Sequence, residues 1–330
     1  MKILKFIITL IAFWSFASCS SNEEGATGGN LPPSTGKEGE LVVVVEDEIW
    51  NSPVGDNLFN LMTVSSYGLP QDEPIFDLVR IPKESFTSIF ETHRNVLFLK
   101  YGDDNGILIK KNLWATDQLV IELTGSSEQE LSNLLEEYAN EITLKYEATD
   151  IKKIQSDIYG AYNATFDNSL KEAHGFSLSI PKDYILDAPE SSKNFYWLRK
   201  DTPQLTQCIW IHVQDYQDTK AFDKETIVDL RNTLGEKHVE GPNEGSYMGT
   251  EMVMPVMTKT TEIDGNYAVE ARGLWKMEGD FMGGPFLSYT VLNKASNKIV
   301  TVEGFMYAPK YKKRNYMQQT EAILKTLTFE

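Results

Sequence analysis

Two different orders of strand and helix patterns divide the globular part of this sequence into halves. In residues 41–160, short apolar runs alternate with segments whose apolar residues recur at helical spacing. In residues 174–330, several strand patterns follow one another, and only two helical patterns accompany them. We therefore predict an α+β protein of two sheet-plus-helix units, the second a mainly antiparallel sheet covered by helices.

The first half contains the clearest helix signals. Ser52 and Pro53 form an N-cap followed by a proline at the first helical position. Ser127 and Glu130 have the spacing of a capping box, and the apolar stripe that follows predicts a helix running to about Tyr159. Strands are predicted at 41–45, 76–81, 96–101, 107–111 and 118–123, with a further helix at 85–92.

The second half is predicted to begin with a half-buried strand at 176–180, where apolar residues alternate with serines. Asp223 is expected to cap a helix, with Gly235 as its C-cap. A last helix is predicted at 312–327. Further strands are predicted at 194–199, 208–214, 248–260, 266–277, 286–293 and 298–307.

The first 18 residues have the layout of a secretory signal peptide. Lys2 and Lys5 precede an apolar run that is too short for a comfortable transmembrane helix, and small residues follow. The ending at Cys19 resembles a bacterial lipobox. That resemblance implies cleavage before Cys19 and attachment of diacylglycerol and a fatty acid such as palmitate. An ordinary signal peptide with an incidental cysteine is the alternative.

Residues 19–40 are predicted to be a flexible tether that carries this lipid at its start, because they offer almost nothing to bury. Glu23 and Glu24 resemble the surface-export signals of Bacteroidota lipoproteins, although solvation of a linker explains them equally well. We expect a protein of the cell envelope, lipid-anchored to the outer membrane. Its facing, toward the periplasm or the outside, stays open.

The charge balance limits the partners. Residues 1–18 hold two of the 31 basic residues and no acid, so the remainder carries 29 basic residues against 48 acidic ones. This excess argues against nucleic acid, and against an anionic membrane surface bound through a basic patch. With 41% hydrophobic residues the chain can form a real core.

The sequence predicts no site for catalysis, for a metal or for a cofactor. His93, His174, His212 and His238 lack the spacing of a zinc site. The serine at 246 stands one position early for a nucleophile elbow, and the acidic turn at 103–105 lacks the later glycine and glutamate of a calcium loop. Cys208 lies in an apolar strand pattern and is predicted to be a packed thiol, so no disulfide is expected if Cys19 is lipidated.

One positive hint is a group of aromatic residues near the glycine-rich turn at 279–284. A partly exposed cluster there could form a platform for a glycan or a peptide. Burial in the core is the alternative, because aromatic residues on a sheet face usually pack inside. The candidate residues are Trp275, Phe281, Phe286 and Tyr289.

Several short motifs resemble a Bacteroidota lipoprotein family known as domain of unknown function 4837, over nearly the whole chain after the signal segment. In the first half they are Leu31-Pro32, 39–44, Trp50 and Gly55-Asp56. In the second half they are 176–181, 196–199, 273–275, 284–286 and 307–309. No activity is assigned to this family, so the resemblance implies none. The second half alone also resembles the PsbP/Mog-type α/β/α sandwich, whose members mostly bind proteins.

Together these observations predict a membrane-anchored lipoprotein, more a non-catalytic binding or envelope-assembly module than an enzyme. Its expected partners are the membrane, through the lipid, and an envelope protein or polymer, with no cofactor. The alternative is an envelope hydrolase or glycan-processing enzyme with an unrecognised site. Two acids facing one another across a deep pocket would support it.

Overall fold

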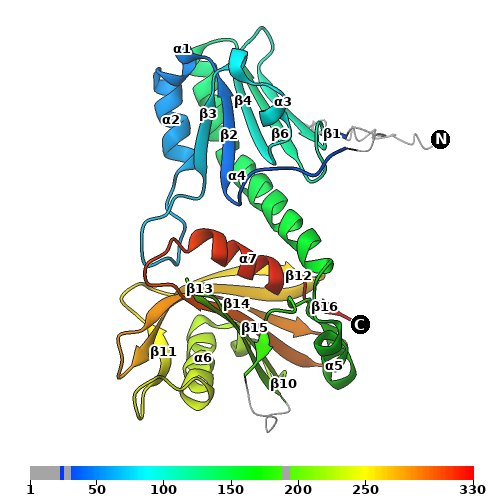
Figure 1. Cartoon of the computed structure of the whole chain (residues 1–330), viewed down its shortest axis with the longest axis vertical. Helices are drawn as coiled ribbons and strands as arrows, with labels where there is room; N and C mark the ends of the chain where they lie inside the picture. Colours follow the sequence, from blue (N-terminus) through cyan, green and yellow to red (C-terminus); the bar gives the residue numbers. More distant parts are fainter. Residues whose placement is uncertain (1–22, 26–30, 188–193) are drawn as a thin grey trace, which may run out of the picture.

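The computed structural model describes residues 23–25, 31–187 and 194–330. The signal segment and Cys19 lie outside these residues. The described chain forms two lobes, one above the other, which are connected by the long helix α4 (Glu128–Tyr159) (Figure 1). Among the described residues, no helix combines the length and the apolar character that a membrane span requires.

The N-terminal lobe is built on a six-stranded sheet in the order β1-β5-β6-β4-β2-β3. β2, β3, β4 and β6 are parallel, β5 runs antiparallel to β6, and β1 pairs parallel with β5. The central β2 is buried on both faces, as is expected for a parallel sheet covered by helices. The strands are β1 (Glu23–Gly25), β2 (Glu40–Val45), β3 (Asp77–Ile81), β4 (Asn95–Tyr101), β5 (Gly106–Lys111) and β6 (Leu119–Gly125).

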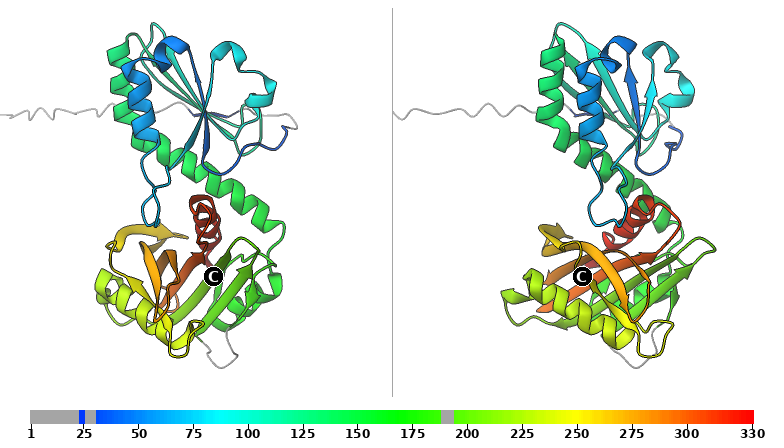
Figure 2. Two further views of the ribbon diagram at one scale, coloured as in Figure 1. Left: turned by 60° about the vertical axis from the view of Figure 1, so that its left-hand side comes forward. Right: turned by 90° about the vertical axis from the view of Figure 1, so that its left-hand side faces the viewer.

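Helices cover both faces of this sheet (Figure 2). α1 (Asp47–Trp50), α2 (Pro53–Met62) and the first half of α4 close over one core, while η1 (Lys83–Ser85) and α3 (Ser88–Glu91) lie by the other. The Ser52 side chain accepts a hydrogen bond from the amide of Val54, so the predicted cap is confirmed. The predicted helix at 85–92 is instead two short turns.

Helix α4 belongs to both lobes. Ser127 accepts a hydrogen bond from the amide of Glu130, and the helix runs without a break to Tyr159, as predicted. Its 32 residues span about 48 Å. Leu131 and Leu135 pack in the N-terminal core, whereas Ile154 and Ile158 pack in the core of the C-terminal lobe. One continuous element therefore anchors each lobe to the other.

The C-terminal lobe is an eight-stranded antiparallel sheet in the order β11-β13-β14-β15-β10-β9-β8, with β12 paired to β13. A two-stranded pair, β7 and β16, lies beside it. The strands are β7 (Phe176–Ser177), β8 (Ile185–Leu186), β9 (Phe195–Asp201), β10 (Thr206–Asp215), β11 (Tyr247–Glu251), β12 (Met257–Ile263), β13 (Asn266–Glu278), β14 (Gly283–Asn293), β15 (Lys298–Tyr307) and β16 (Thr328–Phe329).

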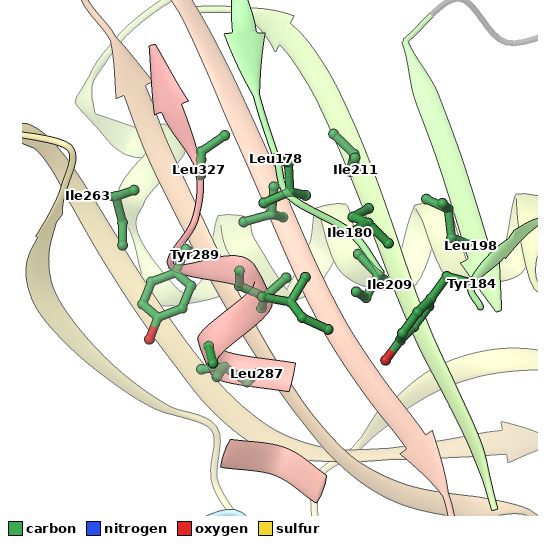
Figure 3. Packing of buried hydrophobic residues seen from close by; sticks show 14 of the residues in the cluster. Leu178, Ile180, Tyr184, Leu198, Ile209, Ile211, Ile263, Leu287, Tyr289 and Leu327 are labelled. Atoms are coloured by element: carbon green, nitrogen blue, oxygen red, sulfur yellow. The ribbon is translucent and has the colours of Figure 1, made fainter. Parts of the chain in front are cut away.

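Each face of this sheet has its own core, which confirms the predicted antiparallel sheet covered by helices. On one face, α7 (Arg314–Leu324), α5 (Ala164–His174) and the end of α4 cover a cluster that contains Ile209, Leu287 and Tyr289 (Figure 3). On the other face, α6 (Lys224–His238) covers a cluster around Trp210 and Phe286.

The segment from 163 to 180 differs from its prediction. Residues 164–174 form α5, which was not predicted, although Asn163 caps its start and Gly175 ends it in the left-handed conformation. The strand predicted at 176–180 is reduced to β7, because its only partner is the two-residue β16 at the chain end.

Three further predictions were wrong. The strand predicted at 248–260 is divided into β11 and β12, which pair with successive parts of β13. Gly235 does not end its helix, since α6 continues to His238. A Cβ atom at Gly235 would lie 2.3 Å from the carbonyl oxygen of Met248, so the glycine serves close packing against β11. Asp223 makes no capping hydrogen bond with its side chain.

Candidate binding site

A cleft of about 620 Å³ lies where the two lobes meet. Its walls come from α4 and the 66–75 segment of the N-terminal lobe, and from β12, β13 and α7 of the C-terminal lobe. Its lining is dominated by charged and polar side chains. Those used below are Glu147, Lys259, Glu262, Glu270, Arg272, Gln318, Glu321 and Lys325.

Arg272 is the centre of a charged network at the cleft. Its Nε donates to Glu270 Oε1 at 2.6 Å and its Nη2 donates to Glu321 Oε2 at 2.7 Å. The Tyr289 hydroxyl lies 3.0 Å from Glu270 Oε2 and 3.3 Å from Glu321 Oε1. Lys325 adds an ion pair of 2.6 Å to Glu321 Oε1. Two carboxylates are thus matched by two cations.

The pKa of Glu321 follows from this arrangement. Burial alone would raise the pKa, because a charged carboxylate loses its hydration. The charges of Arg272 and Lys325, and their hydrogen bonds, outweigh burial and lower the pKa to about 2. Glu321 is therefore ionised at any physiological pH, and both of its oxygens are already engaged.

Glu147 on α4 lines the same cleft, but its electrostatic surroundings differ from those of Glu321. Burial raises its pKa, and the nearby charge of Glu321 raises it further, against the opposing effect of Arg272 and Lys325. Within residues 31–187 and 194–330 its carboxylate makes no hydrogen bond and no ion pair. Glu147 is thus a half-buried acid without a partner.

Gln318 is the second side chain with unmet hydrogen-bonding capacity. It is 9% exposed, and its Oε1 atom is buried without a donor in the described part of the chain. It precedes Glu321 by three residues on α7, so the two share one face of the helix. A buried amide oxygen without a partner carries a desolvation cost, which a ligand could relieve.

The two walls of the cleft are fastened by contacts between the lobes. Glu73 accepts hydrogen bonds from the backbone amides of Lys313 and Arg314 at the start of α7. The Arg314 guanidinium also pairs with Asp77 at 2.7 Å. The hydroxyl of Tyr67 contacts the carbonyl of Pro255 across the lobes. These contacts therefore hold the two walls of the cleft in place relative to each other.

Comparison with known families separates the two lobes. Residues 163–326 match the family described as domain of unknown function (DUF4837), as the sequence motifs of the second half predicted. This match covers the C-terminal lobe and just under half of the chain. Residues 34–159 match a different family, domain of unknown function (DUF8532). The predicted resemblance of the first half to DUF4837 was therefore too broad: its motifs at 39–44, Trp50 and Gly55-Asp56 fall in the DUF8532 match, and Leu31-Pro32 lies outside both matches.

Comparisons with curated proteins give no match. Among solved structures, LpqN, involved in cell envelope biogenesis of Mycobacterium tuberculosis, is 15% identical over 46% of this chain and 82% of that chain, with a TM-score of 0.29. Human StAR-related lipid transfer protein 5 is 10% identical over 52% of this chain and 99% of that chain, with a TM-score of 0.25. At such TM-scores neither likeness carries an argument about function.

The aromatic platform predicted in the DUF4837 domain is not formed. Trp275, Phe286 and Tyr289 are each at most 2% exposed, because strands β13 and β14 turn them into the two cores. Tyr289 lies on the opposite face from the other two. Only Phe281, in the β13–β14 turn, is fully exposed. Trp275 instead lines a small apolar cavity of about 160 Å³ together with Trp197.

Cys208 and His212 have the environments of structural residues. Cys208 is buried, and burial raises the pKa of its thiol to about 12, which confirms a packed, unreactive cysteine. His212 is half-buried, with a pKa lowered to about 4 by burial and then by His238. In the described ranges, no three His, Cys, Asp or Glu side chains are grouped as a metal site would need.

Sequence reasoning missed the cleft. Its residues come from α4, β12, β13 and α7, which are far apart in the chain. The one local signal is the alternation of Glu270 and Arg272 on β13, which places both side chains on the same face of the strand. Nothing local indicates that Glu321 and Glu147 meet them there.

Proposed function

We propose that this protein is a lipid-anchored binding protein of the cell envelope whose ligand occupies the cleft between the DUF8532 and DUF4837 lobes. The observation that carries the proposal is the cleft itself. It has a volume of about 620 Å³, draws its walls from both lobes, and contains two polar side chains, Glu147 and Gln318, that lack partners in the described chain. Concave sites with a few convergent polar groups at domain boundaries are typical ligand sites.

The anchor rests on the N-terminal sequence. Lys2, Lys5, the apolar run and the small residues before Cys19 support export and lipidation. Several acyl chains together give stable membrane binding, since each buried CH₂ group contributes about 0.8 kcal/mol. In its described part, the segment predicted as a flexible tether instead packs on the N-terminal lobe, since β1 pairs with β5 and Thr35 donates its amide to the carbonyl of Thr92. The location that we propose is the outer membrane, with the body facing the periplasm or the outside.

Binding is favoured over catalysis by the state of the carboxylates. Both oxygens of Glu321 are occupied by Arg272, Lys325 and Tyr289, so this residue has no free oxygen for attack or proton transfer. The alternative, a hydrolase or glycan-processing enzyme, is favoured by one observation. Glu147 and Glu321 have pKa values shifted in opposite directions at one cleft, a pattern that acid–base pairs share.

Site-specific crosslinking in intact cells tests the binding site. A photoreactive residue at Leu144, which lines the cleft, is compared with one at Tyr159, which is similarly exposed on the same helix but outside the cleft. We expect a discrete product from position 144 only, and its loss when Thr261→Trp fills the cleft. Equal products at both positions, or none at 144, would count against the cleft.

Three further experiments address the anchor, the facing of the body and the enzyme alternative. Cys19→Ser should abolish incorporation of an alkyne-labelled palmitate and move the protein out of the membrane fraction. Protease treatment of intact cells then reports the facing: degradation without lysis places the body outside, and protection places it in the periplasm. Turnover of envelope polymers or glycans by the purified protein, lost in Glu147→Gln, would establish the enzyme instead.

A further inference from the structure

We propose that the ligand of this cleft presents an alkylammonium group to the carboxylate of Glu147, with the amide oxygen of Gln318 as a second acceptor. The inference rests on the proposed function, and it names the chemistry that the cleft selects.

The first argument is the charge balance at the cleft. Glu270 and Glu321 are matched by Arg272 and Lys325 through ion pairs of 2.6 to 2.7 Å. Glu147 is left over, and the groups that act on it are Glu321, Arg272, Lys325 and Asp150. Asp150 is engaged by Arg94 at 3.0 Å on the N-terminal lobe. The inner cleft therefore lacks one positive charge.

The two other lysines that line the cleft, Lys152 and Lys259, do not supply this missing positive charge. Lys152 pairs with Asp117 outside the cleft wall, at 3.3 Å. Lys259 on β12 is exposed, and within the described residues it forms no ion pair with Glu147. Glu262 beside it is a further exposed acid. A half-buried carboxylate without a counter-charge is costly, and a cation is the ligand that removes this cost most fully.

The second argument is independent of charge. Gln318 is nine-tenths buried, lines the cleft, and leaves its Oε1 atom without a donor in the part of the chain that the structure describes. An amide oxygen accepts hydrogen bonds and cannot donate them. Both unpartnered oxygens, one from α4 and one from α7, thus call for a donor on the ligand.

An ammonium group satisfies both requirements. It is a compact charge with three donors that point in different directions, whereas a guanidinium is a planar fork suited to both oxygens of one carboxylate. Acceptors from two different helices match the first geometry better. The group could come from a lysine side chain of a polypeptide or from a free amine, and both present the same chemistry to Glu147.

Calorimetry on the full chain in detergent tests this inference with three probes of equal length: pentylamine, 1-pentanol and pentanoate. We expect saturable binding of pentylamine only. Glu147→Gln should weaken it by at least about tenfold, as for loss of a charged hydrogen bond. Gln318→Leu should weaken it less. Glu137→Gln, at an exposed acid of α4 outside the cleft, is the matched control and should leave the affinity unchanged.

Proton release separates recognition by Glu147 from a general charge effect. Because the pKa of Glu147 is raised in the free protein, cation binding at a pH where Glu147 is partly protonated should release protons. The measured heat should then depend on the ionisation enthalpy of the buffer, and Glu147→Gln should abolish this dependence. Thermal melting of each variant checks that it is folded.

The source of the ammonium group is distinguished by Nα-acetyl-lysine methylamide. Tighter binding than pentylamine indicates a lysine side chain of a polypeptide, and equal binding indicates a free amine. Binding of pentylamine that Glu147→Gln leaves intact, or preferential binding of pentanoate, overturns the inference. If the Leu144 crosslink forms while no amine binds, the cleft remains the binding site and only its selectivity for a cation is wrong.

Discussion

The backbone amide of Lys313 donates a bifurcated hydrogen bond to the two carboxylate oxygens of Glu73, in the N-terminal lobe, at 2.7 Å and 3.0 Å. Lys313 precedes the first residue of α7 in the C-terminal lobe. An acid at this position meets the unpaired amides and the positive end of the helix dipole. One lobe therefore caps the helix that carries Gln318 and Glu321 into the cleft.

Removing this cap should destabilise the protein. Glu73 is 3% exposed, so Glu73→Ala leaves buried amides without an acceptor. We expect the free energy of unfolding to fall by about 1–3 kcal/mol, measured by urea denaturation. Glu84→Ala, at an exposed acid of the same lobe, should change it little. Equal effects of the two substitutions would contradict the role of Glu73.

Arg272→Met tests the charged network at the cleft. The substitution leaves the carboxylates of Glu270 and Glu321 without their guanidinium. Because the Arg272 side chain is 23% exposed, we expect a cost of about 1–3 kcal/mol, below that of breaking a fully buried pair. Lys276→Met, at an exposed lysine of the same strand, is the control. Adding Glu270→Gln and Glu321→Gln to Arg272→Met should recover much of the lost stability. Absence of recovery in denaturation experiments would mean that packing of Arg272 matters more than charge.

Glu303 should make stability depend on pH. It pairs with Arg231 at 3.0 Å, but burial of the pair prevails and raises the pKa of Glu303 to about 7. The folded state therefore binds more protons than the unfolded state, whose glutamates titrate near about pH 4.3. The contribution of Glu303 is complete below that pH and is lost as the pH rises through about 7.

Glu303→Gln removes this titration. Relative to the variant, the wild type should lose on the order of 3 kcal/mol of unfolding free energy between about pH 4 and pH 8. Urea denaturation of both proteins at four pH values measures it, and comparison with the variant cancels the titration of the other acids. A difference that stays constant with pH would show that Glu303 does not titrate in this range.

Gly235→Ala reverses the usual effect of alanine in a helix. Alanine normally stabilises a helix interior by about 1 kcal/mol relative to glycine. Here its Cβ would meet the Met248 carbonyl, so we expect a loss of about 1–3 kcal/mol or more from overpacking. Gly160→Ala, after the end of α4, has room for the methyl group and should be neutral or stabilising. Thermal melting of the two variants distinguishes the outcomes by sign.

The reactivity of the two cysteines measures both the burial of Cys208 and the lipidation of Cys19. Cys208 is buried with a pKa raised to about 12, so the folded protein should not react with a thiol reagent. After denaturation, protein purified from its native membrane should release one reactive thiol if the sulfur of Cys19 carries lipid, and two if it does not. Cys208→Ala should then give none. Reaction of the folded protein at Cys208 would contradict the packed thiol.

Local signals in the sequence predicted the elements that depend on neighbouring residues. The Ser127 cap and apolar stripe of α4 arise within one helix, and the alternating strands β13 to β15 follow one another along the chain. Where an element depends on a distant partner, prediction was wrong. β7 is short because β16 is short, and Gly235 is needed because β11 passes close to α6.

The sequence by itself determined the α+β class, the two halves, the long helix, and the export and lipidation signal at Cys19 that stays a prediction. These follow from periodicity, capping residues and composition, which act over a few residues at a time. Only the tertiary structure decided that aromatic residues such as Trp275 are core, and that Glu147, Arg272 and Glu321 share one cleft. Burial and charge pairing depend on which surfaces the folded chain brings together, and in the cleft those surfaces come from segments that are far apart along the chain.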